Sequence, residues 1–253
     1  METFQNKKQN AGWSVSGTDA ESMDRELRAY MLGTYNWMAS GLLVTAITAW
    51  FISNTSLSEV FYHIVRTPRG LATSPTLLGV LAMLSPLAFT LVMSLGWQRM
   101  SKTALSTLFW AFSACMGASM ASLAEIYMGQ SVAVAFLAST SMFAAASLWG
   151  YITGADLSRM GNILLMALIG MIVAGFANMF IGSSITSTLL SMLAVAVFAG
   201  LTAWDTQRLK TMWLGGWGGE TGGKESLMAA LGLYLNFVNM FTAILQLTGV
   251  RRD

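Results

Sequence analysis

The chain has 253 residues, of which 55% are hydrophobic and only 10% are charged, and its mean hydropathy is +0.58. Soluble domains carry about 25% charged residues, so this sequence lacks the polar surface that would keep it dissolved in water. A net charge of +2 without a basic run, a single cysteine and a single histidine argue against a nucleic-acid surface, a disulfide framework and most histidine-based metal chemistry.

Charged residues are spread very unevenly along the chain. Uncharged stretches cover residues 29–58, 70–98, 103–124, 126–155, 160–204 and 226–250. A helix needs about 20 apolar residues to cross a bilayer, so five stretches hold one helix each. The longest stretch holds two, divided at Gly182-Ser183-Ser184. The predicted transmembrane helices are residues 35–53, 77–97, 104–125, 132–152, 161–182, 185–206 and 227–247.

This pattern predicts an all-α polytopic membrane protein in which each span is α-helical, because lipid hydrogen-bonds no backbone group. Residues 1–34 are polar and contain several acids, unlike a cleaved signal peptide, and Thr18-Asp19-Ala20-Glu21 has capping-box spacing. We therefore expect an N-terminal segment with a short surface helix over residues 1–34, a membrane domain over 35–250 and a short tail over 251–253. The loop over residues 54–76 carries no recognisable motif.

The distribution of lysine and arginine predicts the orientation of the chain. Ten of the 14 basic residues fall on the side that holds the N-terminus and the other four on the opposite side. Positive residues are enriched in cytoplasmic loops, so we expect the N-terminus in the cytoplasm and the C-terminus outside. Short outer loops and the lack of a signal peptide favour a bacterial inner membrane.

Two acids border the predicted helices: Asp205 at the cytoplasmic end of the sixth and Glu125 at the outer end of the third. An ionisable group at membrane depth costs several kcal/mol and is a functional candidate. The alternative is an interfacial acid that reaches headgroup water. Asp205 should have a cation nearby, either Arg99 from the second helix or Arg208 one turn on. Protonation would release such a pair, whereas a static pair would only join two helices.

The last predicted helix carries a polar stripe. Its members recur at intervals of three and four and share one helical face: Gly232, Asn236, Asn239, Ala243 and Gln246. Amides in lipid need partners, so this face should look into the bundle, with the last helix at its centre. Asn178 in the fifth helix is a further inward amide. The stripe serves either hydrogen bonding between helices or the lining of a polar path.

Several segments resemble the Bax inhibitor-1 family of membrane proteins. They are residues 148–151 (LWGY), 156–161 (DLSRMG), 198–208 (FAGLTAWDTQR), 231–235 (LGLYL) and 237–241 (FVNMF). The resemblance covers roughly residues 25–250. It implies a seven-helix bundle with the last helix in the middle. It also implies a pH-sensitive calcium leak, in which paired acids on helices six and seven sense protons and an arginine of helix two closes the cytoplasmic mouth.

Carried over residue by residue, the resemblance assigns Asp205 as the acid of helix six, which would also bind calcium transiently. The acid of helix seven falls at Asn236, which cannot ionise, and Arg99 is assigned as the latch from its depth. The expected lining of the path is Asn239, Gln246, Glu125 and Asn178. Without a second acid, proton sensitivity should move to lower pH and flatten, and a divalent cation should be held more weakly.

The preferred hypothesis is therefore a calcium-permeable leak channel gated by protonation of Asp205. The alternative is a non-conducting regulator that binds membrane proteases or other membrane proteins, which the amide at Asn236 favours. An enzyme is not expected. An aspartyl protease needs two facing acids in the membrane, and Asp205 has no acid opposite it on the last helix. A membrane serine protease would need a histidine within the membrane, and His63 lies in a loop. The expected partners are the lipid bilayer, the calcium ion and other membrane proteins, with no bound cofactor and no nucleic acid.

Overall fold

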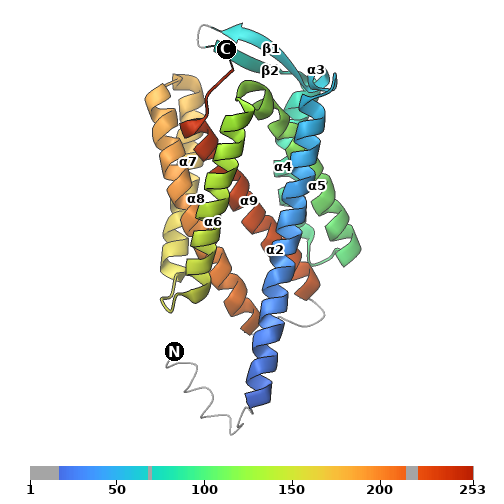
Figure 1. Cartoon of the computed structure of the whole chain (residues 1–253), viewed down its shortest axis with the longest axis vertical. Coiled ribbons are helices and arrows are strands. Elements are labelled where there is room, and N and C mark those ends of the chain that lie inside the picture. The colour runs from blue at the N-terminus through green and yellow to red at the C-terminus, as the bar shows by residue number, and fades with distance from the viewer. Residues whose placement is uncertain (1–16, 68–69, 215–221, 253) are drawn as a thin grey trace.

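The computed structural model describes residues 17–67, 70–214 and 222–252. Its long helices are α2 (Gly17–Ser53), α4 (Leu77–Gly96), α5 (Lys102–Ile126), α6 (Gly129–Ile152), α7 (Ser158–Ile181), α8 (Ser184–Met212) and α9 (Gly222–Thr248). A short helix, α3 (Ser58–Phe61), precedes two strands, β1 (Tyr62–Thr67) and β2 (Gly70–Pro75). Within these residues, seven helices are long and apolar enough to cross a membrane. The predicted seven-helix membrane fold is confirmed (Figure 1).

The ends of the helices are set by residues that satisfy the free backbone groups. Gly182 ends α7 with a φ of +69°, a left-handed conformation that glycine adopts without steric penalty. The next residue, Ser183, begins α8 by accepting a hydrogen bond from the Thr186 N–H through its side chain. Thr76 and Ser101 cap α4 and α5 in the same way. The division of the longest uncharged stretch at residues 182–184 is therefore confirmed.

The first helix is longer than the predicted transmembrane segment. One continuous helix, α2, runs through residue 34, where a surface helix was expected to lead into a separate span. No proline interrupts residues 17–53, so nothing in the local sequence stops the helix. Residues 1–16 of the expected N-terminal segment and residue 253 of the tail lie outside the described residues.

The loop over residues 54–76, in which the sequence shows no recognisable motif, contains a β-hairpin. The strands pair antiparallel from Tyr62 opposite Pro75 to Thr67 opposite Gly70. Tyr62 is buried, and its hydroxyl donates to the Ala118 carbonyl oxygen of α5 at 2.9 Å. The hairpin therefore lies over one end of the bundle, outside the apolar spans, where backbone groups can pair with one another without a lipid-exposed edge (Figure 1).

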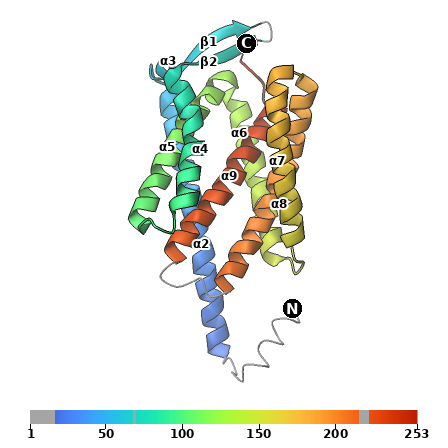
Figure 2. The same cartoon turned by 180° about the vertical axis from the view of Figure 1, so that it is seen from behind.

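Helix α9 lies at the centre of the bundle and packs against α2, α5, α6 and α8. In the most apolar 18-residue segment of α9, 67% of the residues are buried, against 0% in the corresponding segment of α7. Tyr234, near the middle of α9, is fully buried and shares a 2.6 Å hydrogen bond with Thr45 of α2. Figure 2 shows α9 crossing obliquely between α4 on one side and α7 with α8 on the other. The predicted central position of the last helix is confirmed.

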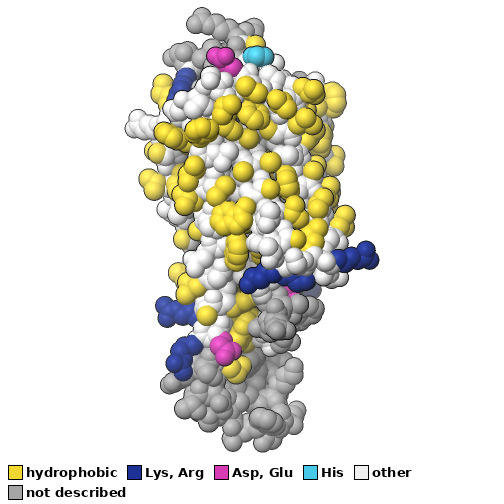
Figure 3. All heavy atoms as spheres, turned by 90° about the vertical axis from the view of Figure 1, so that its right-hand side faces the viewer, with side chains coloured by type: hydrophobic (Ala, Val, Ile, Leu, Met, Phe, Trp, Pro, Cys, Tyr) yellow, Lys and Arg dark blue, Asp and Glu magenta, His cyan; other side chains and the backbone are white. Residues whose placement is uncertain are grey.

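The outer surface separates apolar and charged side chains. Figure 3 shows apolar side chains over the body of the bundle and most of the lysines and arginines toward the end where α2 begins. We call this end the basic end, because six described basic residues lie at the helix termini there: Arg99, Lys102, Arg159, Arg208, Lys210 and Lys224. The opposite end is called the hairpin end. An apolar belt between polar ends is the surface expected of a multi-pass membrane protein.

Candidate functional site

Asp205 lies on α8, two turns before the helix ends at the basic end of the bundle. Its side chain is half-buried, and its Oδ2 accepts a hydrogen bond from Asn236 Nδ2 of α9 at 2.7 Å. Helices α8 and α9 pack closely along their length, which brings the two side chains together. The two residues that the sequence placed in the candidate sensor are therefore in direct contact.

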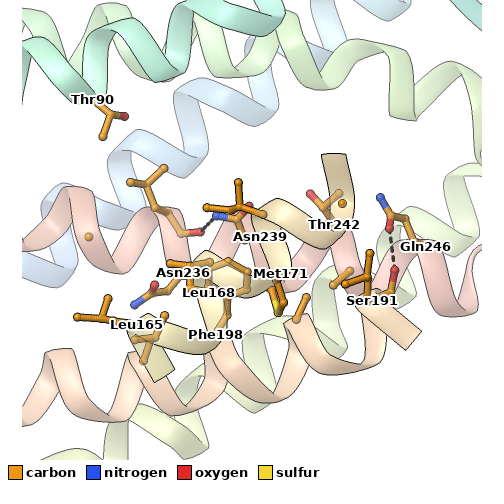
Figure 4. A pocket seen from close by; sticks show the side chains of 18 of the residues that line it. Thr90, Leu165, Leu168, Met171, Ser191, Phe198, Asn236, Asn239, Thr242 and Gln246 are labelled. Atoms are coloured by element: carbon orange, nitrogen blue, oxygen red, sulfur yellow. Dashed lines mark hydrogen bonds between the residues drawn. The ribbon is translucent and has the colours of Figure 1, made fainter. Parts of the chain in front are cut away.

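A crevice of about 1010 Å³ extends from Asp205 along α9 toward the hairpin end. Its walls come from α4, α7, α8 and α9. All members of the predicted polar stripe line it: Gly232, Asn236, Asn239, Ala243 and Gln246. In Figure 4, Thr90 of α4 stands across the crevice from Leu165 of α7, with Asn236 and Asn239 of α9 between them. Helix α4 packs on α5, and α7 packs on α8. The crevice lies between α4 and α7.

The other amides of the expected path are hydrogen-bonded within the bundle. Gln246 accepts a hydrogen bond from the Ser191 hydroxyl of α8 at 2.8 Å, as Figure 4 shows. Asn178 donates to the Ser187 hydroxyl at 2.8 Å and thereby closes the turn between α7 and α8. Asn239 donates to a carbonyl of its own helix and stays exposed. Gln246 and Asn178 therefore join helices and line the crevice at the same time.

A second, smaller cavity lies between Asp205 and the basic end. It has a volume of about 370 Å³ and is bounded by α2, α4, α8 and α9. Asp205, Arg208 and Gly232 line both this cavity and the crevice. We call it the basic-end cavity. Asp205 therefore stands at the junction of two hollows, one on each side of it along the axis of the bundle.

The structure distinguishes the two candidate cations. Arg208 lines both hollows, and its guanidinium carbon lies 5.5 Å from the centre of the Trp204 ring. Arg99 is exposed in the turn between α4 and α5 and lines neither the crevice nor the basic-end cavity. Among the described residues, the side chain that holds the Asp205 carboxylate is an amide, and the expected ion pair with Arg99 is not formed.

Glu125 lies in a different part of the molecule. It is in the last turn of α5 at the hairpin end and borders a cavity of about 540 Å³ between α2, α5, α6 and α9. Arg252 of the C-terminal tail lines the same cavity. The structure therefore separates Glu125 from the crevice in which the other expected path residues lie.

A seven-helix bundle with the last helix at its centre is the arrangement that the family resemblance implied. Residues 27–253 match the family described as "Inhibitor of apoptosis-promoting Bax1". The chain belongs to the Bax inhibitor-1 family.

Bacterial members of the Bax inhibitor-1 family align along nearly the whole chain. RP147 of Rickettsia prowazekii is 39% identical over 233 residues, which is 92% of this chain and 94% of that protein. A protein of Deinococcus radiodurans is 37% identical over 239 residues, covering 94% of this chain and 97% of its own. The inner membrane protein YbhL of Escherichia coli is 37% identical over 228 residues, covering 89% of this chain and 93% of its own.

In this Bax inhibitor-1 protein, the Thr-Gln pair that follows Asp205 anchors α8 to other helices. Thr206 is fully buried and contacts the Tyr35 hydroxyl of α2 at 3.2 Å. Its hydroxyl also donates to the Ser147 hydroxyl of α6 at 3.3 Å, and Tyr35 and Ser147 are hydrogen-bonded to each other. Three helices therefore meet at three hydroxyl groups directly beside the acid.

Gln207 connects α8 to the turn between α6 and α7. Its Oε1 accepts a hydrogen bond from the Leu157 N–H at 2.8 Å, and its Nε2 donates to the Ala155 carbonyl oxygen at 2.7 Å. Leu157 is the residue before α7, so Gln207 supplies the acceptor that this helix start needs. Each side chain of the Asp-Thr-Gln segment thus binds a different element, which explains why the segment contains these three residue types.

Two glycines of the family-like segments allow close packing around Asp205. A Cβ on Gly150 of α6 would lie 2.1 Å from the Ala203 carbonyl oxygen of α8. A Cβ on Gly161 of α7 would lie 2.3 Å from the ring of Trp204. Small residues let membrane helices approach closely, and here they bring α6 and α7 onto the two residues that precede the acid.

Sequence reasoning missed one side chain of this site, Glu225 in the first turn of α9. Glu225 is only 5% exposed and lines the basic-end cavity that Asp205 also lines. Its Oε2 is buried and accepts no hydrogen bond within the described part of the chain. The signal in the sequence was its position: Glu225 directly precedes the uncharged stretch over residues 226–250, just as Asp205 directly follows the uncharged stretch over residues 160–204.

Proposed function

We propose that this protein is a pH-sensitive, calcium-permeable leak channel of the inner membrane, in which Asp205 controls the passage of the ion. The observation that carries the proposal is the place of Asp205 at the junction of the crevice and the basic-end cavity. The relative YbhL, described as an inner membrane protein, supports the location. The excess of lysine and arginine at the basic end supports its placement in the cytoplasm.

The charge of Asp205 would act on the ion and on the helices together. The ionised carboxylate attracts a divalent cation, and protonation removes this attraction. A neutral carboxyl oxygen is also a weaker acceptor than a carboxylate. Protonation would therefore weaken the 2.7 Å hydrogen bond from Asn236, which is the polar contact between α8 and α9 at this level. A change of pH is thereby converted into a change in how two helices of the crevice are held.

Arg208 is the cation best placed to compete with calcium for Asp205, because both side chains line the same two hollows. The latch role proposed for Arg99 would require the turn between α4 and α5 to move toward α8, since Arg99 is exposed and outside both hollows. Replacing each arginine by glutamine would separate these roles. The variant that alters the pH response of calcium flux identifies the latch.

The proposal is tested by calcium flux into proteoliposomes over the physiological pH range, for the wild type and Asp205→Asn. The wild type should show a pH-dependent flux. Asp205→Asn should show a flux that no longer responds to pH and is at least about tenfold lower, because the loss of one charge near the ion costs more than about 1.4 kcal/mol. Flux with unchanged pH dependence in Asp205→Asn would refute the proposal.

Asp156→Asn is the matched control, because Asp156 is an exposed acid at the same end of the bundle that lines neither hollow. Hydrogen bonds from the side chain and backbone N–H of Ser158 hold the pKa of Asp156 below its ordinary value, so it stays ionised over the range tested. This variant should behave as the wild type. A wild type that passes no calcium at any pH would instead favour the non-conducting regulator, which the amide at Asn236 supports.

A further inference from the structure

Glu225 presents a buried carboxylate oxygen that nothing in the described part of the chain satisfies. The residue is 5% exposed, and its Oε2 accepts no hydrogen bond from the described residues. Leaving an acceptor on a charged group buried and unpaired costs more than leaving a neutral acceptor unpaired. Such a group in a folded protein points to a bound water or ion.

The position of Glu225 at the start of α9 does not by itself account for this burial. The helix dipole stabilises an acid in the first turn of a helix, and it does so even when the carboxylate oxygens are in water. Here Thr34 of α2 hydrogen-bonds the neighbouring Ser226 at 2.8 Å and draws α2 over the first turn of α9. Helix α2 therefore packs beside the turn that carries Glu225, and the dipole supplies no donor to Oε2.

Among the described residues that line the basic-end cavity, Asp205 and Glu225 are acids and Arg208 is the cation. The exposed guanidinium of Arg208 lies over the Trp204 ring. The adjacent Lys224 does not neutralise Glu225 by a direct bond. Its ammonium group donates instead to the carbonyl oxygens of Gln98 and Met100 in the turn between α4 and α5, at 3.3 and 3.1 Å.

The cavity also offers neutral oxygen atoms and space. The side chains of Tyr30 and Ser94 line it beside the two acids. Its volume of about 370 Å³ corresponds to roughly 12 water molecules at about 30 Å³ each. Calcium prefers six to eight oxygen ligands and accepts waters among them. Glu225, the hydroxyl groups and several waters would therefore hold a partly hydrated ion, and Asp205 would attract it from its own place in the cavity wall.

We propose that the basic-end cavity is a divalent-cation site in which Glu225 is the second carboxylate, acting with Asp205 across the cavity. Glu225 thus supplies, about three helical turns closer to the basic end, the acid that is absent at Asn236. The choice of calcium rests on the proposed function, whereas the site itself rests on the buried oxygen and the cavity. The ion would reach Glu225 first from the basic end and Asp205 next.

The test measures binding separately from flux, on the purified full chain in detergent. Terbium(III) replaces calcium and emits when excited through a nearby tryptophan, and Trp97 lines this cavity. Terbium emission and its displacement by calcium are followed for the wild type, Glu225→Gln, Asp205→Asn and the control Glu26→Gln, which changes an exposed acid of α2. Glu225→Gln and Asp205→Asn should each weaken binding by about tenfold or more, because each removes one of two carboxylate charges. Glu26→Gln should bind as the wild type.

Thermal unfolding keeps the test decisive if a variant is altered in stability. Without metal, Glu225→Gln should unfold at the same temperature as the wild type or higher, because an unpaired buried charge is removed. Calcium should raise the unfolding temperature of the wild type and of Glu225→Asp but not of Glu225→Gln. Binding by Glu225→Gln equal to the wild type, or a wild type with no saturable binding, would overturn the inference. Saturable binding without flux would refute the proposed channel and leave the site standing.

Discussion

Asn236 holds the Asp205 carboxylate without adding a charge to it. Its amide lies 2.7 Å from Asp205 Oδ2, at the position where the Bax inhibitor-1 resemblance places a second acid. Two carboxylates at this distance would share a proton, because both cannot stay ionised so close together. The amide therefore preserves the contact between α8 and α9 while removing the proton that a pair of acids would share.

Asn236→Asp should restore the shared proton. We expect the midpoint of pH-dependent calcium flux to move toward neutral pH by about one unit or more, since repulsion between carboxylates disfavours the doubly ionised state. Flux into proteoliposomes at a series of pH values measures the midpoint. Asn239→Asp is the control, because Asn239 lines the same crevice but hydrogen-bonds its own helix. Identical pH profiles for Asn236→Asp and the wild type would rule out this account of the switch.

How far single residues could be predicted depended on what the sequence encodes about them. The uncharged stretch placed Asp205 at the end of its helix and the polar stripe placed Asn236 on an inward face, whereas the pairing of the two came from the family resemblance. Depth in the membrane does not give the direction of a side chain around its helix, so it left both Arg99 and Arg208 as candidate partners of Asp205; Arg208 is the one that lines the same hollows. Glu225 was missed because the sequence does not show that α2, which is distant in sequence, packs beside the first turn of α9.

At the scale of elements, the helices were predictable because two strong constraints fix them. A span needs enough apolar residues to cross the lipid, and its ends need capping groups such as Ser183 and Gly182. Long uncharged stretches indicate membrane helices and do not indicate short strands, so the hairpin was missed. Its first strand, β1, is a short run with β-branched residues, YHIVRT, next to Pro68. The capping-box spacing at residues 18–21 indicated a helix start close to Gly17, where α2 begins, but it did not show that this helix continues without a break into the span.

Close packing of α6 on α8 should depend on Gly150. Gly150→Ala should lower the free energy of unfolding by about 1–3 kcal/mol, because the added Cβ meets a backbone carbonyl that cannot rotate away. Thermal unfolding in detergent measures the effect. Gly170→Ala in α7 is the matched control. No atom lies within 4 Å of its added Cβ, so it should leave stability unchanged or raise it by about 0.5–1 kcal/mol. Equal stability of the two variants would contradict the packing argument.

At the scale of the whole molecule, the two ends of the bundle differ in charge. The basic residues predict that the basic end faces the cytoplasm. In a Cys115→Ala background, a membrane-impermeant maleimide should label Arg252→Cys in intact cells and Arg159→Cys only after permeabilisation. Both positions are exposed, at the hairpin end and the basic end respectively. The reverse labelling pattern would show that the basic end faces outward.

The length of α2 has a mechanical consequence. With 37 residues it extends about 55 Å, whereas the hydrocarbon core of a bilayer is about 30 Å thick. Above its start, Leu27 and Met31 pack against Leu209 of α8, and one turn further Tyr35 contacts Thr206, the neighbour of Asp205. The part of α2 that extends beyond the hydrocarbon is therefore joined by packing to the segment of α8 that carries Asp205. A partner that displaced this part of α2 would move the acid-bearing segment without entering the lipid.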